Sequence, residues 1–209
     1  MRLDTPVSKQ LSTFPCLALL ILSGITVTTI TVAPAIPSTA PQFVSDDAFT
    51  SAILNSTNFF RAAHNASAVT YNATLARFAA DYLDTAANCP AFEHSGGPYG
   101  ENLALGCSDV QGCVDMWGNE RDLYNFADPG FGHDTGHFTQ LVWKNTTDVG
   151  CSRRLCGATG WYLVCEYFPR GNVMGQFGDE VNPEVEATSG AAPLAVRVAS
   201  IGPCTHPRV

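Results

Sequence analysis

Two histidines in the second half of the chain are the first candidates for chemistry. His133 and His137 are four residues apart, a spacing that allows two imidazoles to chelate one metal ion if both lie on one helix. Gly136 stands between them, and the segment before it is rich in glycine and proline, which is typical of a loop. We therefore expect His133 to be exposed and not to form a chelate with His137.

Motifs of several enzyme classes are missing from the 209 residues. The chain has no His-Glu-x-x-His helix of a zinc protease and no Gly-x-Ser-x-Gly turn of a serine hydrolase. Its cysteines are expected to be oxidised, which disfavours a thiol nucleophile. With 45% hydrophobic and 14% charged residues, a net charge of −8 and no Lys/Arg cluster, the chain predicts one folded domain with no nucleic-acid partner.

The N-terminus has the pattern of a secretory signal. Arg2 and Lys9 precede an apolar run from Leu17 to Val32, and small residues follow. We predict a signal peptide at 1–35 and an extracellular protein. The alternative is a membrane anchor, because 14–33 is just long enough to span, but its Ser and Thr residues weaken that interpretation. No later segment is long and apolar enough, so no span is expected after cleavage.

Cysteines and glycosylation sequons agree with export. Cys16 lies in the signal, which leaves seven of the eight cysteines, so at least one has no internal partner; we expect this to be Cys204. Cys107 and Cys113 are close enough in sequence to close a local disulfide. Four N-x-Ser/Thr sequons predict N-glycosylation, at Asn55, Asn65, Asn72 and Asn145.

Hydrophobic periodicity predicts helices first and strands late, an α+β domain over 45–178. It lies between a linker at 36–44 and a flexible tail at 179–209. The four expected helices run from Ser45 to His64, from Asn72 to near Cys89, from about Asp109 to Glu120, and for a short stretch after Gly136; the expected strands are 148–155 and 161–168. His94 is expected to hydrogen-bond within the Gly-rich loop 94–100.

Several motifs together resemble the CAP superfamily of cysteine-rich secretory proteins, antigen 5 allergens and plant pathogenesis-related class 1 proteins. Residues 136–143 (GHFTQLVW) are similar to its first signature, and 162–172 (YLVCEYFPRGN) to its second, although Glu166 stands where many members have asparagine. Residues 94–103 resemble the plant members. The loop from Tyr124 to Phe131 is most similar to the pathogen-related yeast proteins, fungal members that bind and export sterols.

The resemblance, which covers about 46–177, implies a three-layer α–β–α sandwich with a central cleft. It implies the disulfides Cys89–Cys156 and Cys151–Cys165, whereas Cys107–Cys113 rests on proximity alone. It also implies four cleft residues: His64, Glu101, Glu120 and His137.

Two imidazoles and two carboxylates in a cleft can bind a divalent metal or act as acid and base. They can equally form a structural hydrogen-bond network in which each glutamate orients a histidine. No cofactor is required, but the resemblance implies weak, exchangeable Zn²⁺ or Mg²⁺ binding at His64 and His137.

The aromatic loop has two interpretations as well. Its rings can plug the edge of the core, or they can line an apolar site for a sterol. The resemblance favours the sterol, with the candidate contacts Tyr124, Asn125, Phe126, Pro129 and Phe131. For the helices that carry Phe49, Ile53, Phe60, Phe78 and Tyr82, packing in the core is preferred to parting around a fatty acid.

The sequence therefore predicts a secreted, glycosylated, monomeric CAP-domain protein that binds sterols, and as a further option fatty acids, without catalysis. Two alternatives stay open. One is a metal-dependent hydrolase or protease that uses the His/Glu cleft, and the other is a host-directed or cell-wall interaction protein that uses the acidic tail.

Overall fold

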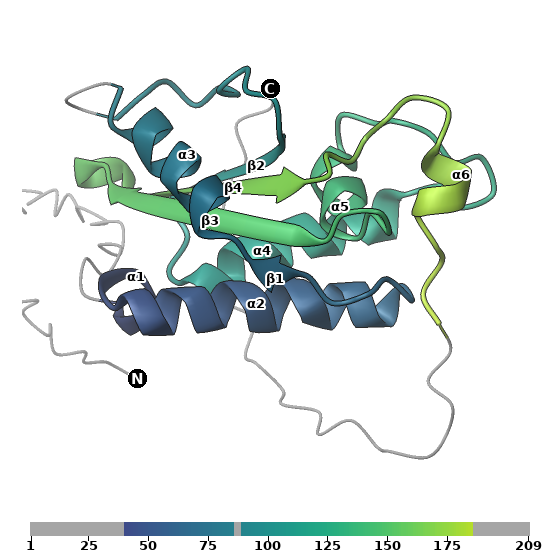
Figure 1. Ribbon diagram of the computed structural model, residues 1–209, viewed down its shortest axis with the longest axis horizontal. Helices are drawn as coiled ribbons and strands as arrows, with labels where there is room; N and C mark the ends of the chain where they lie inside the picture. Colours follow the sequence, from purple (N-terminus) through teal and green to yellow (C-terminus); the bar gives the residue numbers. More distant parts are fainter. Residues whose placement is uncertain (1–39, 86–88, 186–209) are drawn as a thin grey trace, which may run out of the picture. The chain divides into compact units, whose positions relative to one another are not determined.

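A four-stranded sheet forms the middle layer of the domain (Figure 1). The computed structural model describes residues 40–85 and 89–185. The strand order is β1-β3-β4-β2; β1 runs parallel to β3, and the other neighbours are antiparallel. The strands are β1 (Thr70–Tyr71), β2 (Gly100–Leu105), β3 (Asp148–Leu155) and β4 (Trp161–Phe168).

Helices cover both faces of this sheet. Helix α3 lies on one face, and α2 and α4 lie on the other (Figure 1). The helices are α1 (Pro41–Val44), α2 (Asp46–Ala63), α3 (Ala73–Leu83), α4 (Val110–Asn119), α5 (Gly136–Leu141) and α6 (Phe177–Glu180), with 3₁₀ turns η1 (Glu120–Leu123) and η2 (Gly157–Thr159). The predicted α+β sandwich is confirmed. Within the described residues, no helix has the length and apolar character needed to cross a membrane.

Local capping explains where the main helices begin. The side chains of Ser45, Asn72 and Asp109 each accept hydrogen bonds from backbone N–H groups in the first turns of α2, α3 and α4. These three starts were predicted, and β3 and β4 have the predicted bounds. The sequence did not predict α1, β1, β2 or α6.

A buried arginine ties α2 to the rest of the domain. The Arg61 side chain is fully buried, and it donates hydrogen bonds to the carbonyl oxygens of Ser67, Leu141, Trp143 and Thr146 over 2.7–3.1 Å. Burial lowers its pKa to about 10, with Tyr167 acting in the opposite direction, so the guanidinium stays charged at neutral pH. Four carbonyl partners replace the water that this charge has lost.

All three expected disulfides are present. Cys89 pairs with Cys156 and Cys107 pairs with Cys113. The third, Cys151–Cys165, joins two residues that face each other across β3 and β4. Cys204 and the predicted signal peptide lie outside the described residues.

The expected domain boundaries were too narrow at both ends. The linker prediction is wrong at 41–44, because α1 forms there and the ring of Phe43 is buried and stacked 4.9 Å from that of Trp161. The tail prediction is wrong at 179–185. Glu180 accepts two hydrogen bonds from Asn145, and Val185 donates its N–H to the carbonyl of Ala63. These contacts are far apart in sequence, which is why local composition missed them.

Candidate functional site

The first part of the site is an imidazole–carboxylate pair at the start of α5. Nδ1 of His137 lies 2.6 Å from a carboxylate oxygen of Glu120. The other oxygen accepts the backbone N–H groups of His137 and Phe138, each at 3.0 Å. Glu120 therefore both orients the imidazole and caps the helix that carries it, where a negative charge is favourable.

Two asparagines fix the position of α5 from other elements. The amide of Asn102, in β2, donates to the carbonyl oxygen of His137. Asn172, which follows β4 and has a φ of 55°, donates to the carbonyl of Gly136 and accepts from the hydroxyl of Thr139. Both motifs of the resemblance, 136–143 and 162–172, thus meet at one helix end.

A second imidazole–carboxylate pair involves His94. Its Nδ1 lies 2.6 Å from a carboxylate oxygen of Glu101, and the backbone N–H of Ser95 donates to the same carboxylate. The hydrogen bond with Glu101 raises the pKa of His94, whose side chain is 63% exposed. The expectation that His94 hydrogen-bonds within the loop 94–100 is therefore wrong, because its partner, Glu101, is on β2.

The placement of His64 corrects the expected set of four. Its ring is buried, its Nδ1 lies 2.8 Å from the carbonyl oxygen of Asn182, and its Nε2 has no hydrogen-bond partner. Its neighbours are the rings of Phe126 and Phe138, and burial lowers its pKa. Among the described residues, His64 has no hydrogen bond or ring contact with Glu101, Glu120 or His137.

The donors left for a metal are few. Within the described part of the chain, no three His, Cys, Asp or Glu side chains are grouped so that they could hold an ion. His64 does not fit a metal because its ring is buried beside two phenylalanine rings and its Nδ1 is engaged by a carbonyl. His94 and His137 fit better. A carboxylate that accepts the Nδ1–H group fixes the tautomer in which Nε2 keeps a lone pair for a metal.

The aromatic loop divides into an anchored part and an exposed part. The rings of Tyr124 and Phe126 lie 4.9 Å apart, and both contact Phe138 in the core. Tyr124 is buried and Phe126 is half-buried. These two rings therefore plug the edge of the core, the structural alternative that sequence left open.

Phe131 is on the exposed part of the loop. Its side chain is 46% exposed, and its ring lies 6.5 Å from that of Phe177. Met174, three residues before Phe177, is 75% exposed. Asn125 and Pro129 are exposed, and Asn125 accepts a hydrogen bond from the N–H of Ala127. His133 is exposed as predicted.

The helices considered for a fatty acid do not share one interior. Phe49, Ile53 and Phe60 are buried in the core between α2 and the sheet. Phe78 and Tyr82 belong to α3, on the opposite face. Packing in the core, the preferred interpretation, agrees with this arrangement.

Comparison with known proteins identifies the family. The family model described as "CAP: Cysteine-rich secretory protein family" matches residues 54–167. The chain belongs to the CAP family. It is 45% identical to protein PRY2 of Saccharomyces cerevisiae over 137 residues, which are 65% of this chain and 41% of PRY2. It is 40% identical to the secreted protein RBT4 of Candida albicans over 138 residues, 63% of this chain and 38% of RBT4. The chain thus spans less than half of each of these relatives.

Solved structures show the same CAP fold. Venom allergen-like protein 4 of Schistosoma mansoni has a TM-score of 0.53 and 23% identity, over 69% of this chain and 97% of its own. Hookworm platelet inhibitor has a TM-score of 0.53 and 18% identity, over 67% of this chain and 79% of its own. At these identities the likeness concerns the fold alone.

One residue of this CAP domain departs from the signature and lies beside the site. Glu166 is fully buried in β4 and faces Glu101 directly across the pair with β2. No N–H or O–H donor among the described residues reaches its oxygens, and the residue opposite it is the carboxylate Glu101. Burial, and then the charge of Glu101, raise the pKa of Glu166 to about 9. A carboxyl group with this pKa is mostly protonated at neutral pH, and in that form it has an O–H that can donate to Glu101.

Glu101 lies between His94 and Glu166, and its carboxylate stays ionised at neutral pH. Burial on its own would raise its pKa, but hydrogen bonds from His94, Ser95 and Glu166 outweigh burial and lower it. Sequence reasoning missed His94 and Glu166 as members of the site. The signal was present, because His94 precedes Glu101 by seven residues across a glycine-rich turn, which can fold back onto the strand.

Proposed function

We propose that this chain is a secreted, non-catalytic protein that binds a sterol, or a related small lipid, outside the cell. Sequestration would need no bond to be made or broken, because the driving force is the removal of apolar surface from water. The observation that supports it is the exposure of two large apolar side chains, Phe131 and Met174, while the rings of Tyr124 and Phe126 in the same loop as Phe131 are anchored in the core. The CAP relatives named as secreted proteins agree with an extracellular site.

The anchored rings change which residues test the proposal. Tyr124 and Phe126 contact Phe138 in the core, so replacing them would also disturb folding. Phe131 and Met174 are exposed and are the contacts proposed for the lipid, with Pro129 and Asn125 at the rim. The anchored rings would hold the loop in place, and the exposed side chains would cover the flat face of the ligand.

The variant Phe131→Ser tests this assignment. Loss of the half-exposed ring should weaken sterol binding about fivefold to tenfold, because burying such a ring contributes roughly 1 kcal/mol or more. Binding of a radiolabelled sterol gives the affinity, and thermal unfolding shows that the domain is intact. The matched control is Leu155→Ser, on a side chain that is 41% exposed at the end of β3. Unchanged affinity in folded Phe131→Ser with Met174→Ser would exclude this surface.

A weak divalent-metal site is a separate proposal, and it concerns His94 and His137. The supporting observation is that each imidazole is oriented by a carboxylate at 2.6 Å. Zinc titration by calorimetry at neutral pH should give weak heats that are lost in His94→Ala and His137→Ala. They should persist in a folded His64→Ala protein. Zinc heats that survive in both of the first two variants would place the ion elsewhere.

Hydrolysis is the competing class of function for the same groups. The carboxylate of Glu120 has three hydrogen-bond contacts, and that of Glu101 is bonded to His94 and Ser95, so both carboxylates already serve structural partners. Turnover of peptide or ester substrates that a chelator abolishes, and that His137→Ala lacks, would favour the hydrolase over a lipid carrier.

A further inference from the structure

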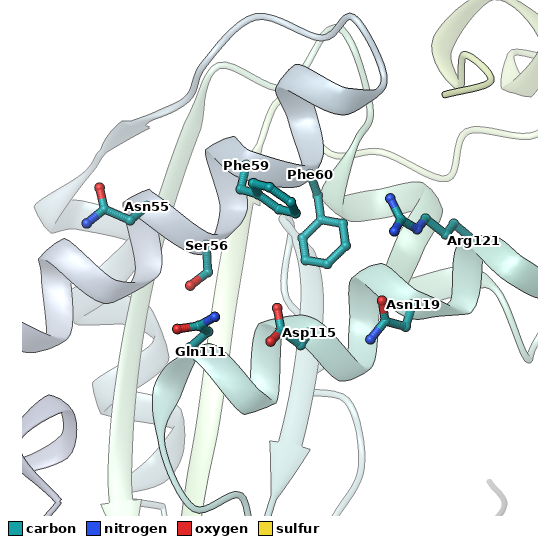
Figure 2. A pocket seen from close by; sticks show the side chains of 8 residues that line it. All are labelled: Asn55, Ser56, Phe59, Phe60, Gln111, Asp115, Asn119 and Arg121. Atoms are coloured by element: carbon teal, nitrogen blue, oxygen red, sulfur yellow. The ribbon is translucent and has the colours of Figure 1, made fainter. Parts of the chain in front are cut away.

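A groove between α2 and α4 is lined by residues that belong neither to the two imidazole–carboxylate pairs nor to the aromatic loop, although two of them, Asn119 and Arg121, flank Glu120 in the chain. Its volume is about 420 Å³, which is in the range of small-molecule sites. We call it the α2–α4 groove. Its lining, drawn in Figure 2, consists of Asn55, Ser56, Phe59, Phe60, Gln111, Asp115, Asn119 and Arg121.

The lining combines one exposed aromatic ring, that of Phe59, with a row of polar side chains on α4. Phe59 is 65% exposed. Gln111, Asp115 and Asn119 recur every fourth residue, so they form a row along one face of α4 (Figure 2). An acyl chain would cover these amides and this carboxylate without hydrogen-bonding them, at a cost in free energy. A sugar ring has C–H groups for the aromatic face and hydroxyl groups for the polar row.

A sugar can be attached at the rim of this groove. Asn55 begins the sequon Asn55-Ser56-Thr57 and stands at one end of the groove, with Arg121 at the other (Figure 2). Phe59 follows Asn55 by four residues on α2, so their side chains are neighbours on the helix surface. A glycan on Asn55 would begin next to the exposed ring.

The other three sequons lack this arrangement. The Asn72 amide caps α3 and donates to Asp148, and the Asn145 amide donates to the buried carboxylate of Glu180. Asn65 is exposed just after α2 but does not line the groove. Asn65 therefore serves as the control, because it is an exposed sequon that lies outside the α2–α4 groove.

We propose that the N-linked glycan of Asn55 lies in the α2–α4 groove, with its first sugar rings against Phe59 and the polar row of α4. In the transfer, Nδ2 of Asn55 bonds to C1 of a lipid-linked oligosaccharide diphosphate. The C1–O bond breaks, the lipid diphosphate leaves, and Nδ2 loses one proton. Thr57 of the sequon is buried within α2, so transfer precedes folding of this helix. The inference rests on the proposed secretion and not on lipid binding.

The test uses the full chain secreted from a eukaryotic host. Peptide mapping by mass spectrometry gives the occupancy of each sequon. An amidase that removes N-glycans is then applied to the folded protein, and the release rates at Asn55 and Asn65 are compared. We expect occupancy at both, with release about fivefold slower at Asn55 because its glycan is held in the groove. Phe59→Ser should bring the two rates together while thermal unfolding stays unchanged.

Each other outcome counts against the proposal. An unmodified Asn55 overturns it while leaving secretion intact, whether or not Asn65 is occupied. Retention of the chain inside the host cells would instead contradict the proposed secretion. Equal release rates in the unsubstituted protein also overturn the glycan proposal. A labelled fatty acid that binds equally to the chain and to Asn55→Gln, but not to Phe59→Ser, would assign the groove to an acyl chain instead.

Discussion

At the scale of single residues, the site is a pair of histidines that two carboxylates hold in fixed orientations. Glu120 fixes His137 and caps its helix, and Glu101 fixes His94. The sequence allowed a structural hydrogen-bond network in which each glutamate orients one histidine. The structure has such a network, but its second histidine is His94 and not His64. Each carboxylate costs less to bury because it has several donors.

Glu166 gives this site a dependence on pH. Its pKa is raised to about 9 in the folded chain, above its ordinary value in the unfolded chain. Its stabilising contribution is therefore complete below that ordinary value and is lost as the pH rises towards 9. His94, whose pKa is also raised, acts in the same direction, and His64, whose pKa is lowered, acts in the opposite one.

The variant Glu166→Gln isolates this contribution, because the amide stays neutral and still donates to Glu101. Between about pH 5 and about pH 8.5, the unsubstituted chain should lose stability by at most about 1.4 kcal/mol per pH unit from this group. Glu166→Gln should lose less over the same range, as denaturant unfolding at several pH values would show. Parallel profiles for the two proteins would contradict a protonated Glu166.

At the scale of helices and strands, local patterns explain the long elements and long-range contacts explain the short ones. The caps Ser45, Asn72 and Asp109 and the apolar runs of β3 and β4 are local signals, and they predicted those elements. Helix α1 depends on Phe43 meeting Trp161 more than a hundred residues later. Such a contact has no signature in a short window of sequence.

The same limit explains the errors at the site. Asn182 lies beyond the predicted domain, yet its carbonyl binds His64 and removes that imidazole from the expected set. The pairing of Glu166 with Glu101 depends on the register of β2, a strand that the sequence did not predict. Two disulfides were accessible through the family motifs, and Cys107–Cys113 was accessible from its short separation in sequence. The order of the main helices was accessible from hydrophobic periodicity.

Replacement of Phe43 tests whether α1 belongs to the domain. Phe43 is 1% exposed and stacked on Trp161, so Phe43→Ala should lower the free energy of unfolding by about 3–5 kcal/mol. Val44→Ala is the control, because Val44 is 57% exposed in the same helix. Denaturant unfolding of both variants gives the comparison. If Phe43→Ala lowers the free energy of unfolding no more than Val44→Ala does, residues 41–44 are a linker and not part of the domain.

At the scale of the whole molecule, the CAP fold supplies a rigid body with separate surfaces. Asn102 and Asn172 hold α5 by hydrogen bonds, and ring contacts with Phe138 hold the aromatic loop. The α2–α4 groove has its own set of lining residues. A shared fold does not by itself define a ligand, so function has to be argued from these surfaces. The exposed side chains of Phe131 and Met174 support the lipid proposal, and the groove supports the glycan proposal.

Sterol binding by the purified, secreted chain tests the central claim most directly. A radiolabelled sterol is titrated against the folded protein, and bound sterol is measured after free sterol is removed. We predict saturable binding that an unlabelled sterol displaces, that Phe131→Ser weakens and that Leu155→Ser leaves unchanged. Absence of saturable binding by a correctly folded, disulfide-bonded chain would contradict the account.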